Sequence, residues 1–315
     1  MRASDQIIHK AAWLYYTHNM RQEEVAKALN ISRASVAAYL RKAREAGVVS
    51  ISASTRLYRE ETLARRLEDG LGLGAVWIVP EGGGAMSAEA NIPFVAANAF
   101  LSLIGPTSRI GVAWGRTIYH VADAMDVADL QDVTVTQLCG NLGAPYTYRP
   151  DQCTIEIARR LNARPINLYA PLVLSTEELA RGLRAERVVA GQLAGIAECD
   201  IALFSVGSVE PDSHIVACGA LPADKLARMR EEGAVGVIGG QLIDGAGRWI
   251  DCSYNRRLIS VDLDTVRRIP KRFVVVVEAG KFEALAAAIR GGFVSHLVVS
   301  AEMGQKLLEA GLEKP

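Results

Sequence analysis

The sequence predicts an α/β protein in which a small helical domain precedes a large domain built on a mainly parallel sheet. Three observations lead to this prediction. Residues 1–54 carry apolar side chains at helical spacing, and residues 73–315 alternate short β-rich apolar runs with helical stretches. Residues 55–72 join the two as a charged amphipathic helix. A chain of 315 residues has room for two domains of ~100–200 residues each.

The composition is that of an ordinary globular protein, with half of the residues apolar and 22% charged. The N-terminus is too polar for a secretion signal, and the apolar run Phe273–Val277 is far shorter than the ~20 residues that cross a bilayer. We therefore expect a cytoplasmic protein without a membrane segment. No CxxC pair or histidine cluster indicates a metal site, and we expect free thiols. The cysteines are Cys139, Cys153, Cys199, Cys218 and Cys252.

The net charge of zero hides an asymmetry between the two ends of the chain. Residues 1–60 carry ten Lys or Arg against five Asp or Glu, which gives a net charge of +5 that the remainder offsets. Phosphate contacts supply much of the affinity of a DNA-binding protein. The front of the chain therefore has the charge expected of a part that meets a polyanion.

Residues 5–45 carry the signals of a helix-turn-helix. An amphipathic helix over residues 5–18 precedes a short helix over Gln22–Leu29. Asn30 tolerates the left-handed conformation that a sharp turn requires, and Ser32 can cap the helix that follows. The predicted buried face of that third helix consists of Val36, Tyr39 and Leu40. The segment Gly47–Ser52 alternates weakly, which predicts a short strand and makes the domain a winged helix-turn-helix.

The third helix would lie in the major groove of double-stranded DNA. Arg33 is the best candidate for a hydrogen bond to a base edge. The residues suited to contact thymine methyl groups are Ala34, Ala37 and Ala38. The candidates for phosphate contacts are Gln22, Ser32, Ser35, Arg41, Lys42 and Arg44. The alternative is a helical hairpin that serves packing alone, with these polar residues on a solvated face.

The segment over residues 55–72 places Leu57, Leu63, Leu67 and Leu71 at helical spacing. It is either a connecting helix or part of a dimer seam. Beyond it, the expected strands lie in VWIVP, SRIGVAWG, VTVTQLCGN, RPINLYAP, CDIALFSVGS, VGVIGG, RFVVVVEAG and SHLVVSA. Helical stretches separate most of them, which predicts a mainly parallel sheet with helices on both faces. Ligands of such folds bind outside the carboxyl ends of the strands.

Several of these strands end in glycine-rich loops. They are Gly111–Thr117, Cys139–Pro145, Ser205–Ser208 and Asp244–Gly247. A tight turn would explain any one of them, but four at strand ends favour a shared ligand crevice. Neither GxGxxG followed by an acidic residue nor GxxxxGK[ST] is present, so a nucleotide cofactor is not favoured and none is expected.

Together these motifs resemble the SorC/DeoR-type family of bacterial sugar-binding transcriptional regulators. The resemblance spans almost the whole chain and rests on AAWLYY, QEEVAKALNISRASV, GVAWGRT, DIALFSVGS, GAVGVIGGQLIDGAG and AAAIRGGFVSHLVVSAE. It implies an effector domain, residues 73–315, that is similar to sugar-phosphate isomerases and CoA transferases and that also forms the oligomer. It further implies a small sugar phosphate or polyol as effector, a homo-oligomer (dimer or tetramer), and control of a carbohydrate-utilisation operon.

Carried over by position, the resemblance assigns ten residues to the effector crevice. They are Gly115, Arg116, Thr117, Gly140, Asn141, Gly207, Ser208, Asp244, Lys281 and Glu302. For Lys281 the alternative is a solvated lysine at a helix start, although the helix dipole disfavours a cation there.

The sequence departs from the family pattern at four places. Val237 stands where family members often carry aspartate, Ser300–Glu302 replaces a Thr-Asp-Glu run, and Ala38 replaces an arginine of the third helix. Glu278 replaces part of a glycine pair before Lys281. If Glu278 reaches the crevice it would repel a phosphate, which favours a non-phosphorylated polyol.

Two other functions remain as alternatives. A sugar-phosphate-converting enzyme with an appended DNA-binding domain would need a general acid and base across the ligand. The candidates are Asp244, Glu278, Glu302 and His214, but none matches an isomerase catalytic loop, and His214 is expected on the surface or in a loop. A purely structural nucleoid protein would leave the glycine loops unexplained. A regulator without enzymatic activity is the prediction.

Overall fold

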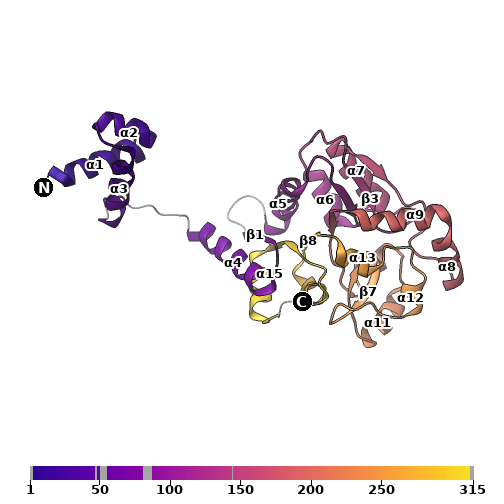
Figure 1. Cartoon of the computed structure of the whole chain (residues 1–315). Coiled ribbons are helices and arrows are strands. Elements are labelled where there is room, and N and C mark those ends of the chain that lie inside the picture. Colours follow the sequence, from indigo (N-terminus) through magenta and orange to yellow (C-terminus); the bar gives the residue numbers. More distant parts are fainter. Residues whose placement is uncertain (1–2, 47, 50–54, 81–86, 144, 313–315) are drawn as a thin grey trace. The chain divides into compact units, whose positions relative to one another are not determined.

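The structure, a computed structural model, describes residues 3–46, 48–49, 55–80, 87–143 and 145–312 (Figure 1). The chain divides into two compact units, Met1–Tyr58 and Arg59–Pro315. We call them the small unit and the large unit.

Among the described residues up to Glu45, the small unit contains three helices, α1 (Ala3–Tyr16), α2 (Gln22–Leu29) and α3 (Arg33–Glu45). Asn30 ends α2 in the left-handed conformation, with φ 52°. The hydroxyl of Ser32 accepts a hydrogen bond from the backbone N–H of Ser35 at 3.0 Å and so caps α3. Turn and cap therefore agree with the sequence prediction.

One buried cluster holds the three helices of the small unit together. It consists of Ala11, Ala12, Val25, Ala26, Val36, Leu40 and Ala43, with Tyr39 partly buried beside it. Most of the segment predicted as a wing strand, namely Gly47 and residues 50–52, lies outside the described residues. The N–H groups of Val48 and Val49 both donate to the carbonyl of Ala43, which closes the end of α3.

Helix α4 (Thr55–Leu71) crosses the boundary between the units. Ala64, Leu67 and Leu71 are buried in the core of the large unit, where Leu63 packs beside them. The carboxylate of Glu68 also accepts a hydrogen bond from the backbone N–H of Val76 at 2.8 Å. Leu67 and Leu71 therefore belong to the core of the large unit, and a dimer seam along this helix stays a prediction.

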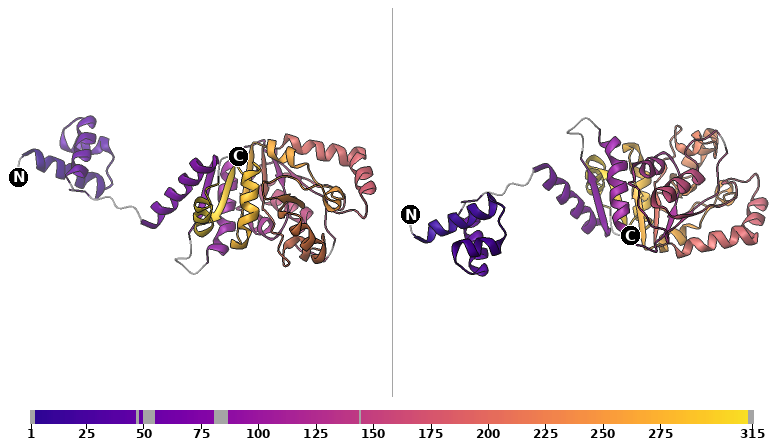
Figure 2. Two further views of the ribbon diagram at one scale, coloured as in Figure 1. Left: turned by 90° about the horizontal axis from the view of Figure 1, so that it is seen from below. Right: turned by 90° about the horizontal axis from the view of Figure 1, so that it is seen from above.

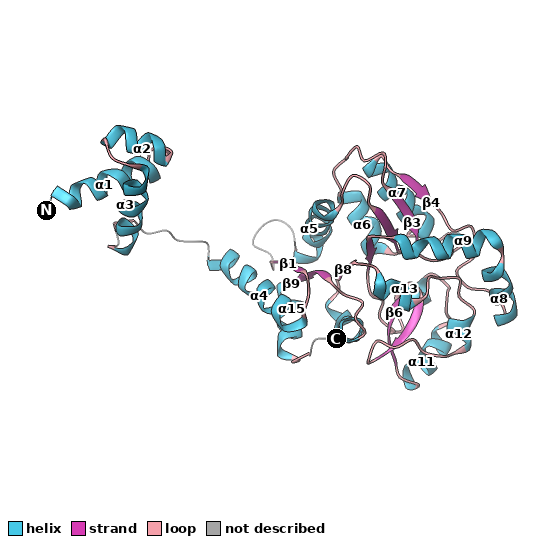
Figure 3. Ribbon diagram, viewed as in Figure 1, coloured by secondary structure: helices cyan, strands magenta, loops and turns pink. Residues whose placement is uncertain are grey.

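A seven-stranded parallel sheet forms the frame of the large unit, in the order β1-β9-β8-β5-β2-β3-β4. Figure 3 draws the strands in magenta. Its strands are β1 (Ala75–Val79), β2 (Arg109–Val112), β3 (Thr134–Gln137), β4 (Arg164–Ile166), β5 (Ile201–Phe204), β8 (Lys271–Val275) and β9 (His296–Ser300). Neighbouring strands pair in parallel throughout this sheet. The prediction of a mainly parallel sheet is confirmed.

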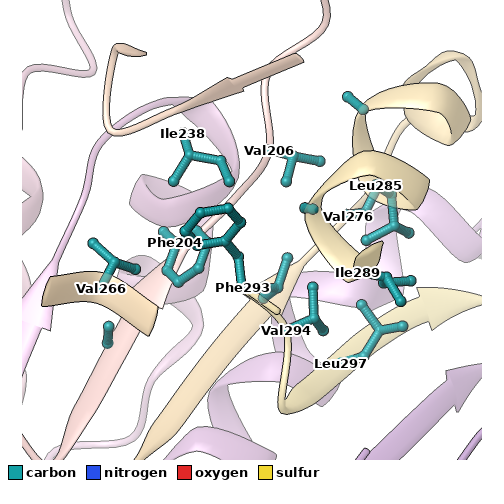
Figure 4. Packing of buried hydrophobic residues seen from close by; sticks show 14 of the residues in the cluster. Phe204, Val206, Ile238, Val266, Val276, Leu285, Ile289, Phe293, Val294 and Leu297 are labelled. Carbon is teal, nitrogen blue, oxygen red and sulfur yellow. The ribbon is translucent and has the colours of Figure 1, made fainter. Parts of the chain in front are cut away.

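Helices cover both faces of this sheet (Figure 2). One face packs against α5 (Ala88–Leu103), α6 (Arg116–Ala124) and α7 (Pro150–Leu161). The other packs against α4, α13 (Leu263–Arg268), α14 (Phe282–Arg290) and α15 (Ala301–Glu309). The alternation along β5 explains the two cores: Ile201 and Leu203 face the first layer, and Ala202 and Phe204 face the second. Figure 4 shows Phe204 in the second core beside Phe293.

A separate hairpin joins β6 (Ala234–Ile238) to β7 (Gln241–Asp244) in antiparallel pairing. Gly239 and Gly240 form its turn, both with positive φ (57° and 87°), which two-residue hairpin turns of this type demand. VGVIGG forms a strand as predicted, but this strand lies in the hairpin and not in the parallel sheet. Strand β7 was not predicted. A glycine pair after a strand can reverse the chain as readily as it can lead into a helix.

Shorter elements complete the large unit. They are α8 (Glu177–Ala185), α9 (Arg187–Gly195), α10 (His214–Ala217), α11 (Ala223–Glu231), α12 (Ser253–Arg256) and the 3-10 turns η1 (Ile196–Glu198) and η2 (Ala279–Lys281). Within the described ranges, no helix is both long and apolar enough to cross a membrane. The same residues hold no group of three or more His, Cys, Asp or Glu arranged to bind a metal ion.

Candidate functional site

A cavity of about 560 Å³ opens where β2, β5 and β8 end. These strands are neighbours in the sheet, in the order β8-β5-β2, so the loops that follow them converge at one edge. The loops supply Ala113–Thr117, Ser205–Ser208 and part of Glu278–Lys281 to the lining. The volume is in the usual range for small-molecule sites.

Six of the ten residues assigned to the crevice line this cavity. They are Gly115, Arg116, Thr117, Gly207, Ser208 and Lys281. Gly115 has φ 116° and ψ 171°, a conformation that only glycine adopts without strain, and it is the N-cap residue that precedes α6. The turn therefore directs the first residues of α6 at the cavity.

Gly140 and Asn141, which follow β3, are not among the lining residues. A Cβ on Gly140 would lie 2.5 Å from the carbonyl oxygen of Pro171, so this glycine permits close backbone packing. The amide oxygen of Asn141 accepts hydrogen bonds from Nε2 of Gln137 (3.1 Å) and from the backbone N–H of Asp151 (3.0 Å). The assignment of both residues to the crevice is corrected, because their loop serves packing.

Asp244 and Glu302 also lie outside the lining. The Oδ1 of Asp244 accepts from the backbone N–H groups of Ala246 and Arg248, each at 2.9 Å, and so fixes the turn that follows β7. Glu302 lies in the first turn of α15, where it pairs with Nζ of Lys306 at 2.6 Å. Asp244 is the last residue of a hairpin strand rather than of a strand of the parallel sheet, and the glycine loop that follows it does not line the cavity.

Glu278 lines the cavity and forms ion pairs with Arg116 and Lys281, the two cationic residues among the described lining. Its Oε1 lies 2.9 Å from Nη2 of Arg116, and its Oε2 lies 2.7 Å from Nζ of Lys281. Burial alone would raise the pKa of Glu278, but Lys281 and Arg116 outweigh burial and hold that pKa below its ordinary value. The Glu278 carboxylate is therefore charged at neutral pH.

An aromatic group lines another part of the cavity. The Tyr146 hydroxyl and Nδ1 of His214 share a hydrogen bond of 2.8 Å, and the ring centroids of His214 and Trp114 are 4.9 Å apart. Tyr148 lies beside Tyr146, with ring centroids 6.1 Å apart. The cavity therefore offers aromatic faces as well as charges.

His214 is a cavity residue, so its placement as a surface or loop histidine was wrong. Burial, followed by the charges of Lys281 and Arg116, lowers its pKa to about 4. The imidazole is neutral at physiological pH and can both donate and accept a hydrogen bond.

Ser213 is a further cavity residue that sequence reasoning missed. It is only 4% exposed and lines the cavity, yet its hydroxyl has no hydrogen-bond partner among the described residues. A buried hydroxyl without a partner is costly unless a ligand or water satisfies it. Trp114 could have been found from its place inside GVAWGRT. Tyr146 and Ser213 stand in loops that carry no such signal.

In the small unit, most of the ten residues proposed to contact DNA are exposed. The exposed ones are Ser32, Arg33, Ala34, Ala37, Arg41, Lys42 and Arg44. Gln22, Ser35 and Ala38 are partly buried. Arg33 forms an ion pair with Glu23 of α2 at 3.3 Å, and both side chains are more than two-thirds exposed. Such a pair contributes little to stability, so Arg33 is free to change partners.

Comparison with known proteins finds a matching family and relatives that cover almost the whole chain. Residues 56–309 match the family described as "Putative sugar-binding domain". Over 318 residues the chain is 30% identical to the "Uncharacterized transcriptional regulator YjhU" of Escherichia coli K12, covering 98% of this chain and 95% of that protein. The chain belongs to the SorC/DeoR-type family of transcriptional regulators. It is a regulator with a sugar-binding domain.

Other proteins that resemble this regulator are also named as regulators. It is 25% identical over 312 residues to the deoxyribonucleoside regulator of Bacillus subtilis 168, covering 98% of each protein. Its fold is similar to the crystal structure of the full-length sorbitol operon regulator SorC from Klebsiella pneumoniae. That likeness has a TM-score of 0.73 at 21% identity and covers 96% of this chain and 99% of the other.

Proposed function

We propose that this regulator holds double-stranded operator DNA through α3 and changes its hold when a small sugar phosphate or polyol fills the cavity. The observation that carries the proposal is the cavity itself, at the carboxyl ends of three adjacent strands. It joins aromatic faces, paired charges and a buried hydroxyl that no described residue satisfies. Aromatic faces with a few placed polar groups are typical of small-molecule sites.

The small unit supports the DNA part of the proposal. Arg33, Arg41, Lys42 and Arg44 are exposed on α3. Arg33 stands at the start of the helix, which is where such helices contact base edges. The excess of positive charge in residues 1–60 agrees with a phosphate-contacting surface. By family resemblance, we propose a dimer or tetramer that controls a carbohydrate-utilisation operon.

We further propose that the cavity binds without turnover. A pKa of about 4 makes His214 a weak general base at neutral pH. Glu278 is committed to Arg116 and Lys281, and the depressed pKa that results makes it a poor proton donor. An enzyme acting on sugar phosphates would need a matched acid and base in this place.

A two-step experiment tests the proposal. A panel of sugars, polyols and their phosphates is screened against the full-length protein for an increase in melting temperature. The compound that binds is then added to the protein–DNA complex, using DNA selected by the protein from a random pool. We expect the amount of bound DNA to change while the compound is recovered unaltered. Catalytic consumption of the compound would contradict the proposal, and so would an amount of bound DNA that stays the same when the compound is added.

A further inference from the structure

We infer that Glu278 is the specificity-determining residue of the cavity: it occupies both cationic side chains and reserves the site for an uncharged, hydroxyl-rich ligand. This inference rests on the proposed function, because it concerns the same cavity. It selects one of the two effector classes, the unphosphorylated polyol or sugar, and names the side chain that excludes the other.

The first support is the charge of the lining. Among the described residues that line the cavity, three carboxylates (Glu210, Asp212 and Glu278) face two cations (Arg116 and Lys281). Glu210 is paired with Arg230, which lies outside the lining, at 3.0 Å. With His214 neutral and Arg230 counted, the charges sum to zero, so the cavity has no excess of positive charge. A phosphate group loses much of its hydration on entering a site, and unpaired cationic side chains are a main source of compensation. The described part of this lining offers none, because Glu278 pairs with both Arg116 and Lys281.

The second support is the geometry of the ion pairs. Each cation lies within 3 Å of a different oxygen of the same carboxylate. A phosphate that approached Arg116 or Lys281 would have to displace a charge already in place, or lie beside it and be repelled. The ion pair with Lys281 is also well shielded, since that side chain is only 15% exposed.

The third support is what the lining offers to hydroxyl groups. Ser213 has a buried hydroxyl that no described residue satisfies, and the neutral imidazole of His214 can donate or accept. The carboxylate of Glu278 can accept from a ligand hydroxyl without losing its ion pairs, because each oxygen has more than one lone pair. The rings of Trp114 and Tyr146 supply apolar faces for the C–H groups of a sugar.

Inorganic phosphate is the probe that tests this inference without knowledge of the effector. Its dissociation constant is measured by calorimetry for the full-length wild-type protein and for Glu278→Gln, which keeps the shape of the side chain and frees two cations. We expect phosphate to bind the variant at least tenfold more tightly. No gain in phosphate affinity, with the variant folded by circular dichroism, would overturn the inference.

Glu156→Gln is the matched control. Glu156 also pairs with two cations, Arg159 at 2.5 Å and Arg160 at 3.0 Å, but it lies on α7 and is not a lining residue. We expect this variant to bind phosphate as the wild type does. An equal gain in Glu156→Gln would show a general effect of freed arginines and would count against the role of Glu278.

A second measurement needs no variant and covers the case in which Glu278→Gln does not fold. Each neutral sugar or polyol of the panel is compared with its own monophosphate on the wild-type protein. We expect the neutral member of the binding pair to bind at least tenfold more tightly. A wild-type protein that prefers the phosphate would sink the inference while leaving the proposed function intact. If the bound compound did not change DNA binding, the proposed function would fail and the inference about Glu278 would stand.

Discussion

Glu278 and Arg116 are 162 residues apart in the chain, yet their side chains meet at 2.9 Å. They follow β8 and β2, which are not neighbours, since β5 lies between them in the sheet. The ion pair therefore joins the first residue of α6 to the loop after β8, across a third strand. The lining of the cavity thus forms only when segments that are far apart in the sequence come together in the fold.

The lowered pKa of His214 in the folded protein predicts that the free energy of unfolding falls in acid. The folded pKa of about 4 lies below the ordinary 6.5, mainly because of burial. As the pH falls below 6.5, the unfolded chain takes up a proton that the folded chain does not. The free energy of unfolding therefore falls between pH 6.5 and 4, by at most ~1.4 kcal/mol per pH unit from this group.

Urea unfolding at several pH values in that range compares the wild type with His214→Gln. We expect the variant to lose less stability on acidification. His296, whose pKa burial also lowers, contributes to both proteins and cancels in the difference. Equal pH slopes for the two proteins would show that His214 does not resist protonation.

Gly115→Ala tests the turn that directs α6 at the cavity. The added Cβ would lie 3.1 Å from Nε2 of His214 on a backbone with φ 116°, so we expect a loss of ~1–3 kcal/mol in stability. Gly182→Ala is the control. Gly182 lies inside α8, where a Cβ would meet no atom within 4 Å, and alanine should stabilise there by ~0.5–1 kcal/mol. The same sign of change at both positions in thermal unfolding would refute this prediction.

Leu67→Ala tests whether α4 belongs to the core of the large unit. Leu67 is fully buried in the core that also holds residues of α14, α15 and the sheet, and truncation of such a leucine costs ~2–5 kcal/mol. Leu179→Ala removes the same atoms at a position that is 54% exposed, where we expect less than ~0.5 kcal/mol. Chemical denaturation measures both, and similar costs would mean that α4 is only a tether.

Arg33→Ala tests the base contact proposed for α3. We expect operator affinity to fall by ~1–3 kcal/mol and one base position to be relaxed. Arg65→Ala is the control, because Arg65 is also exposed and paired with a glutamate, Glu61, but lies in the large unit. Fluorescence anisotropy on selected DNA gives both values. Unchanged binding by Arg33→Ala would remove this residue from the recognition surface.

The sequence was informative where local chemistry decides the conformation. Asn30 and Ser32 fix a turn and a cap through their own backbone and hydroxyl, and the apolar runs of the sheet are buried on both faces. Glycine loops were less informative, because glycine permits several conformations. Gly115 opens a helix toward the cavity, Gly239 and Gly240 reverse a hairpin, and Gly140 allows a close backbone approach.

The parts of the cavity that sequence reasoning missed depend on long-range contacts. His214 lies in a four-residue helix after an irregular loop, and only its contacts with Trp114 and Tyr146 place it in the lining. The position of Glu278 in a glycine-poor version of its motif was visible in the sequence. That it would hold both Arg116 and Lys281 follows only from the order of β8, β5 and β2.

The position of β9 has a consequence for the synthesis of the protein. Strand β1 pairs with β9, and β9 alone connects it to the rest of the sheet. Strand β9 and helix α15 come from residues 296–309, near the end of the chain. On the ribosome, the small unit can therefore finish folding long before β1 finds its partner. A chain that ends before residue 296 would contain the small unit but would lack β9, so β1 would have no partner strand in the sheet.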